Sequence, residues 1–138
     1  MKKLILIMIA GVLLLSSCGG SSLPSVDGFD VTTKDGLADY VKTVYEEAEG
    51  FTADEVTVND DAGSDEAKCI ILANVTYSGD KTETETKGSC KDYAEYINQH
   101  LKNAEAPVSD LAVFYTTPHG MMKVAFEDFA LADTMSDF

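Results

Sequence analysis

Apolar residues recur at helical spacing between Lys34 and Glu49. Residues three or four positions apart share one face of a helix. The apolar residues at this spacing are Leu37, Val41, Val44, Tyr45 and Ala48. Thr33 precedes this stripe as a plausible N-cap, because its hydroxyl can accept a bond from a free N–H of the first turn, and Gly50 follows as a stop. The pattern therefore predicts an amphipathic helix over 34–49.

A second helical stripe follows Ser89. Ser89 has the character of an N-cap, and Asp92 three positions on approximates a capping box. The stripe consists of Tyr93, Ile97, His100, Leu101 and Ala104. Pro107 ends the element, since the residue before a proline is pushed away from helical geometry. A second amphipathic helix is therefore expected from Ser89 to just before Pro107.

Between and after these helices, the pattern changes to the alternation and β-branched runs of strands. The predicted strands are Glu55–Val58, Ala67–Tyr77, Lys81–Lys87, Leu111–Thr116 and Met121–Phe129. Ser78, Gly79 and Asp80 are typical of a hairpin turn. Alternating Thr and charged residues over 81–87 indicate a solvent-facing edge strand. The tail 130–138 fits either a strand extension or a loose terminus.

The two halves of the chain resemble each other after a shift of 56 residues, which places Thr33 on Ser89. Residues 38–41 then fall on 94–97, and 54–58 on 110–114. We predict an α+β fold of two layers, built from a duplicated α-β-β unit. One antiparallel sheet of four or five strands would carry both helices on one face. This architecture is loosely similar to that of the PepSY and β-lactamase-inhibitor-protein families.

The first residues form a separate pattern. Met1, Lys2 and Lys3 precede an apolar run of about a dozen residues, too short for a bilayer-spanning helix and typical of a signal peptide. The run ends in Leu15-Ser16-Ser17-Cys18, which resembles the lipobox of bacterial lipoproteins. An ordinary secreted protein with an incidental Cys18 is the alternative.

The lipoprotein resemblance implies cleavage before Cys18 and attachment of diacylglycerol and palmitate to this residue. Residues 1–17 are then a signal peptide, 18–25 a flexible tether and 26–138 a single α+β domain. The protein would be held on the cell membrane or the outer membrane, with its domain facing the periplasm or the exterior.

Cys69 and Cys90 are the remaining cysteines. In a chain exported from the reducing cytoplasm, an even pair favours a Cys69–Cys90 disulfide. Two alternatives stay open. Cys69 lies in an apolar run and would suit a buried free thiol. Cys90, in the first turn of the predicted helix, would suit a reactive thiol, because the helix dipole lowers a thiol pKa there.

The chain is strongly acidic and has no arginine or tryptophan. Loss of residues 1–17 removes Lys2 and Lys3, which takes the formal charge from −14 to −16. Such a charge repels polyanions and excludes nucleic acid as a partner. It favours a basic protein partner, while solubility alone is the plainer explanation.

Candidate chemistry is sparse. The densest acidic segment, 59–66, offers oxygen ligands but fails the EF-hand spacing, which leaves cation binding there undecided. His100 and His119 lack metal-ligand spacing. Glu127 and Asp128 come closest to carboxylates in an apolar run. We therefore predict no catalytic residues, no metal and no cofactor. Tyr40 and Tyr96, at matching repeat positions, either flank a groove between the helices or lie at the core boundary.

Three classes of function remain. The leading prediction is a membrane-anchored envelope lipoprotein with a small, acidic, non-enzymatic binding or structural domain, which implies a patch on the open sheet face or between the helices. The second is an inhibitor or modulator of a basic envelope or extracellular protein. The third is a small hydrolase that depends on carboxylates or a metal, which requires a deep pocket.

Overall fold

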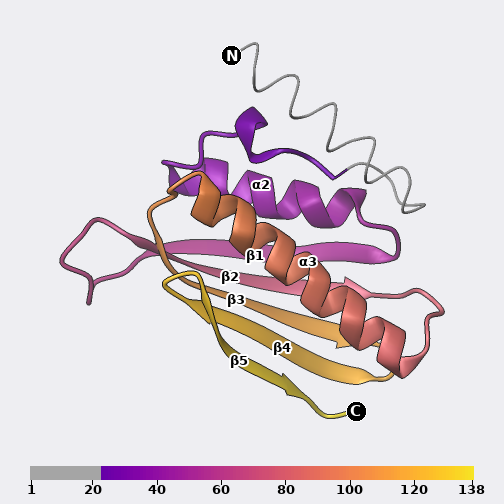
Figure 1. The fold of residues 1–138 in the computed structure, drawn as a ribbon. Helices are drawn as coiled ribbons and strands as arrows, with labels where there is room; N and C mark the ends of the chain where they lie inside the picture. The colour runs from indigo at the N-terminus through magenta and orange to yellow at the C-terminus, as the bar shows by residue number, and fades with distance from the viewer. Residues whose placement is uncertain (1–22) are drawn as a thin grey trace.

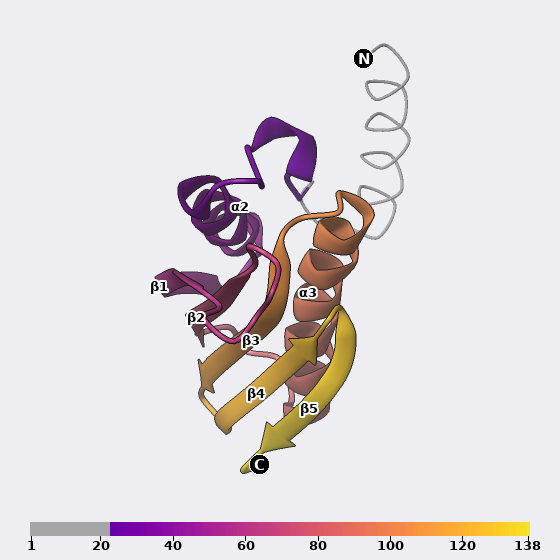
Figure 2. The same cartoon turned by 90° about the vertical axis from the view of Figure 1, so that its left-hand side faces the viewer.

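The computed structural model describes residues 23–138 (Figure 1). Its elements in chain order are η1 (Val26–Gly28), α2 (Lys34–Glu47), β1 (Phe51–Asp60), β2 (Cys69–Tyr77), α3 (Glu83–Asn103), β3 (Val108–Thr117), β4 (Gly120–Glu127) and β5 (Ala130–Ser136). The strands form one sheet, and α2 and α3 lie side by side on one of its faces (Figure 2). The predicted two-layer α+β fold is confirmed.

The sheet has five strands in the order β1-β2-β3-β4-β5. Three neighbouring pairs are antiparallel, but β2 and β3 run parallel. The prediction of a purely antiparallel sheet was therefore wrong at its centre. The reason is α3, which crosses the sheet between β2 and β3 and returns the chain to the end where β2 began, as a parallel connection requires.

The helix α2 begins where the sequence predicted. The Thr33 hydroxyl accepts a bond from the Gly36 N–H at 3.0 Å, which satisfies one free donor of the first turn. The helix ends at Glu47, and Gly50 takes a φ of 85°, a conformation that favours glycine. The buried stripe contains Leu37, Tyr40, Val41, Val44 and Tyr45.

The start of α3 differs from the prediction. Thr82, not Ser89, is the N-cap, and it forms a reciprocal capping box with Glu85. The segment 81–87 is therefore not an edge strand but the cap and first turn of the helix, and 78–80 is not a hairpin turn but the connection into it. Ser89 lies within the helix, where its hydroxyl accepts a bond from the Lys81 ammonium at 2.8 Å.

The order helix–strand–strand occurs twice, as α2-β1-β2 and α3-β3-β4, and β5 is an addition at the end. The two helices end 56 residues apart, at Glu47 and Asn103, which is the predicted shift. Their starts do not match, because α3 has 21 residues and α2 has 14. The tail 130–138 contains a strand, which settles the alternative that the sequence left open.

The core fills the space between the helices and the sheet. Strand residues that alternate toward the helices are buried, among them Ile71, Val75, Val113 and Tyr115. Two residues of the segment predicted as a tether, Leu23 and Pro24, contact the domain. Leu23 packs against the core, and the Pro24 carbonyl accepts a bond from the Tyr96 hydroxyl at 3.2 Å.

Candidate functional site: the open face of the sheet

The lipid-attachment residue predicted from the sequence, Cys18, lies outside the described residues. The predicted Cys69–Cys90 disulfide is absent, because both residues are free, buried thiols. Cys69 starts β2, about 26 Å along the strand from Tyr77. The helix α3 starts near the other end of β2, and Cys90 lies only about 10 Å along it from Glu83. The two cysteines therefore lie far from each other along the sheet, and the disulfide prediction was wrong.

Neither thiol has the environment of a reactive cysteine. Burial raises the pKa of Cys90 to about 12. Because α3 starts at Glu83, Cys90 is not in the first turn, where the helix dipole would have lowered the pKa. Burial also raises the pKa of Cys69. These two residues act as small apolar parts of the core.

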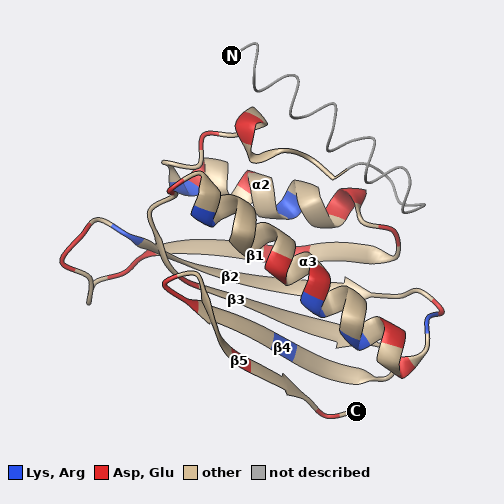
Figure 3. Cartoon of the chain, in the orientation of Figure 1, with Lys and Arg blue, Asp and Glu red and all other residues tan. Residues whose placement is uncertain are grey.

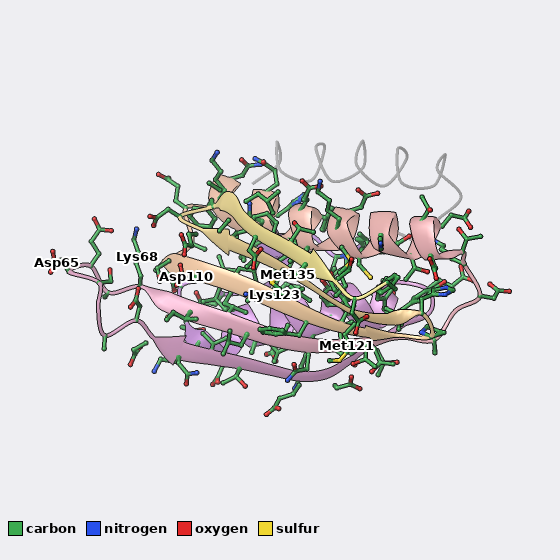
Figure 4. All side chains as sticks on the ribbon, turned by 90° about the horizontal axis from the view of Figure 1, so that it is seen from below. Asp65, Lys68, Asp110, Met121, Lys123 and Met135 are labelled. Atoms are coloured by element: carbon green, nitrogen blue, oxygen red, sulfur yellow. The ribbon has the colours of Figure 1, made fainter. Side chains whose placement is uncertain are left out.

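The acidic segment 59–66 forms the end of β1 and part of the loop to β2. Asp60 pairs with Lys34 at 2.9 Å, and the Asp61 carboxylate accepts the Gly63 N–H at 3.0 Å. Asp65 lies at the far tip of the loop, away from Asp110 on β3 (Figure 4). Within residues 23–138, no group of three or more His, Cys, Asp or Glu residues is arranged to hold a metal ion.

The two histidines are far apart in the fold and have local partners. The His100 Nδ1 lies 2.8 Å from the Tyr96 carbonyl, and its ring stacks on Tyr96 with centroids 4.0 Å apart. His119 lies in the turn between β3 and β4, and its Nε2 is 2.8 Å from the Lys81 carbonyl. The first contact is local within α3, and the second joins the β3–β4 turn to the segment before α3, so both are structural.

Glu127 and Asp128 lie at the turn from β4 to β5. Asp128 and Phe129 both have positive φ, 49° and 65°, as the two central residues of a type I′ hairpin turn do. The turn is held by the Asn98 side-chain amide, which donates to the Phe129 carbonyl at 2.8 Å. The apolar flanks of these carboxylates therefore reflect a hairpin packed against α3, not a catalytic pocket.

Tyr40 and Tyr96 do not flank an open groove. The Tyr40 side chain is fully buried, and within the described residues its hydroxyl has no hydrogen-bond partner. Burial raises its pKa far above the usual range. Tyr96 is half-buried beneath the N-terminal segment, to which it donates its hydrogen bond.

The face of the sheet opposite the helices, here called the open face, carries unexpected apolar side chains. Strand alternation places every second residue there. One cross-strand row consists of Phe114, Lys123 and Met135, which are direct partners on β3, β4 and β5. Met121 and Leu72 lie on the same face, and all four apolar side chains of this group are exposed.

Phe114, Met121, Lys123 and Met135, but not Leu72, line a shallow groove of about 270 Å³. Its lining consists of Phe114, Met121, Met122, Lys123, Met135, Ser136 and Asp137. In Figure 4 the labelled Met121, Lys123 and Met135 lie over the strands of the sheet. The groove has the dimensions and exposure of a site for a few side chains of a partner and lacks the depth expected of a hydrolase active site.

Lys123 lies within the groove, and its charge is compensated. Its ammonium lies 3.3 Å from the Asp133 carboxylate and 6.0 Å from the centre of the Phe114 ring. The aliphatic stem thus adds to the apolar lining, while the charged end is held by Asp133 and the ring. Over the domain as a whole, acidic residues outnumber lysines on the loops and helices (Figure 3).

Sequence reasoning allowed for a patch on the open face but did not name its residues. The signal lay in the phase of the strand 111–116. Leu111, Val113 and Tyr115 share the buried face, so Phe114 must point the other way. An aromatic residue out of phase on a strand that is already buried on one side is the feature that could have located the groove.

Comparison with protein families, with curated proteins and with solved structures found no match. The likeness to the PepSY and β-lactamase-inhibitor-protein architecture therefore stays a prediction. No helix within residues 23–138 is long and apolar enough to cross a membrane.

Proposed function

We propose that this protein is a lipid-anchored, non-enzymatic binding module whose open sheet face binds a partner protein. The observation that carries the proposal is the group of exposed apolar side chains, Leu72, Phe114, Met121 and Met135. They lie on a sheet face that no helix of residues 23–138 covers. Contiguous exposed apolar surface on a small soluble domain marks an interaction site more often than it serves folding.

The charge of the domain defines the partner's chemistry. The chain after residue 17 has a formal charge of −16, and the one lysine of the groove is already paired with Asp133. A partner surface that combines apolar residues with lysine or arginine would gain both burial in the groove and attraction to its acidic surroundings.

The position of the N-terminal segment supports an outward-facing site. Leu23 and Pro24 contact the core and α3, on the side of the helices. If Cys18 is the lipidated residue, the five residues 18–22 reach at most about 17 Å. The helix layer then faces the bilayer, and the open face points away from it toward a partner.

The anchor is tested by labelling. Cells grown with labelled palmitate are expected to label the wild-type protein, and Cys18→Ala is expected to abolish both the label and retention in the membrane fraction. A Cys18→Ala protein that still carries the label would contradict the anchoring proposal.

The site is tested by photo-crosslinking in cells. A photoreactive residue at Met135, on the open face, is expected to give a discrete cross-linked protein. The matched position is Glu95, which is exposed on α3. Equal products from both positions, or products from Glu95 alone, would contradict binding at the open face.

A further inference from the structure

Resting on the proposed binding function, we propose that the partner adds an extended strand to the outer edge of β5. The partner segment would have the side-chain pattern cation–x–apolar–x–cation. Strand addition uses main-chain hydrogen bonds for affinity and alternate side chains for specificity. β5 is the last strand of the sheet, and it forms one wall of the groove.

The backbone of β5 offers hydrogen-bonding groups to such a strand. The Asp137 N–H donates to the Met121 carbonyl, so residue 137 faces β4. Because neighbouring residues of an antiparallel strand alternate in direction, residues 133 and 135 also face β4. The N–H and C=O groups of Thr134 and Ser136 therefore point outward from the sheet.

The edge formed by β1 is protected against pairing with another strand, and the edge formed by β5 is less protected. β1 carries three carboxylates, Asp54, Glu55 and Asp60, has an irregularity between Ala53 and Glu55, and packs beneath α2. These are the devices that discourage edge pairing. β5 carries only Asp133, which is engaged by Lys123. An irregularity near Ala132 limits the regular part of β5 to about its last four residues.

The side chains next to this edge give the partner its pattern. Asp133, Met135 and Asp137 alternate along one side of the strand, with Met135 in the groove and a carboxylate on each side of it. A partner residue opposite Met135 would be apolar, because it extends the groove. Residues two positions away on either side would lie beside Asp133 and Asp137. These carboxylates already accept bonds from the Lys123 ammonium and the Met121 N–H, and each retains acceptor capacity for a cation. Cross-strand pairs of opposite charge stabilise a sheet.

The test uses the full chain, purified from membranes in detergent, and a capped heptapeptide in which two lysines and a central valine alternate with threonines. We expect this peptide, at millimolar concentration, to slow hydrogen exchange at the Thr134 and Ser136 amides. A matched peptide with glutamates in place of the lysines is expected to give no protection. Higher salt is expected to weaken binding of the cationic peptide, because the attraction between its lysines and the carboxylates is electrostatic.

Thr134→Pro removes an outward N–H without breaking the ladder to β4, as proline is tolerated at such edge positions. It is expected to weaken peptide binding about tenfold relative to Thr134→Ala. Ser136→Pro provides a second variant of the same kind if Thr134→Pro unfolds the domain.

Three results would overturn strand addition. One is the absence of protection at Thr134 and Ser136, and another is equal binding to Thr134→Pro and Thr134→Ala. The third is a peptide-free dimer that Thr134→Pro dissociates, since the edge would then belong to a second copy of this chain. Cross-linking from Met135 but not Glu95 would still support the open-face function in the first two cases, so the two proposals fail separately.

Discussion

The two faces of the sheet have similar apolar residues but different surroundings. On the face beneath the helices, Ile71, Val113 and Val124 are completely buried, and Val75 is 1% exposed. On the open face, Leu72 is 39%, Phe114 37%, Met121 58% and Met135 60% exposed. Neighbours along one strand, such as Ile71 and Leu72, thus belong to different environments.

This difference separates residues that fold the domain from residues that are free for another use. Burial of an apolar side chain in the core contributes about 1.5–3 kcal/mol. An apolar side chain left more than a third exposed contributes much less to folding, and it increases the risk of aggregation. Four such side chains on one face, spread over β2, β3, β4 and β5, are consistent with selection for binding.

The sharpest comparison of the faces uses two adjacent residues of β2. Ile71→Ala removes buried atoms and leaves a cavity, so we expect it to lower the free energy of unfolding by about 2–5 kcal/mol. Leu72→Ala, on the open face, is expected to cost less than about 1 kcal/mol. Urea unfolding of both variants measures the difference. Equal losses would mean that the open face is part of the folding core.

A smaller effect is expected from polar groups beneath the helices. The hydroxyls of Tyr45 and Tyr115 lie 2.6 Å apart, and Tyr115 also donates to the Cys90 carbonyl at 2.6 Å. Tyr115→Phe leaves the buried Tyr45 hydroxyl without this partner and removes the additional bond to the Cys90 carbonyl, which lies within α3, at a cost of about 1–3 kcal/mol.

Tyr40→Phe is the matched control, because the Tyr40 hydroxyl is buried without a partner in the described chain. Its removal is expected to stabilise the domain by up to about 1 kcal/mol. Thermal unfolding of the two variants, which lose the same atom, distinguishes the sites. A destabilised Tyr40→Phe protein would show that this hydroxyl has a partner in solution.

The smallest expected effect on stability concerns Asp110, which lies near three other carboxylates at one end of the sheet. Burial, with the negative charges of Glu127, Asp61 and Asp128, raises the pKa of Asp110. Glu127 is its direct cross-strand partner. The folded domain therefore holds the Asp110 proton to higher pH than the unfolded chain does, and stability falls as pH rises from about 4 through the raised pKa.

Asp110→Asn removes this repulsion. It is expected to stabilise the domain at neutral pH by less than about 1 kcal/mol, since the group is largely solvated. The gain should vanish below about pH 4, where the carboxyl is protonated in both states. Unfolding curves across this range provide the measurement. A gain that persisted at low pH would point to a cause other than charge.

Much of the fold could be predicted because local signals agreed. The Thr33 cap, the stripe of α2 and the β-branched run of β2 each led to the correct element. The start of α3 was missed because Thr and Glu alternate from Thr82 to Thr86, which has the period of a strand although Thr82 and Glu85 form a capping box. That error moved Cys90 toward the helix start and made a reactive thiol conceivable there.

The parallel pairing of β2 with β3 could not be inferred locally, because it depends on where α3 returns the chain. The groove could not be inferred from a single stretch of sequence either. Met121 and Met135 come from different strands, and the register of β4 with β5 brings them to one face of the sheet. Only the out-of-phase position of Phe114 was visible in a single stretch of sequence.

The open face is proposed to serve binding and not folding. The most direct measurement is the yield of photo-crosslinked partner from a reactive residue at Met121, in the wild type and in the double variant Phe114→Ser, Met135→Thr. We predict that the yield per folded molecule falls at least about fivefold, as loss of a central contact would cause. The unfolding temperature should change by only a few degrees. An unchanged yield in the folded double variant would contradict the account.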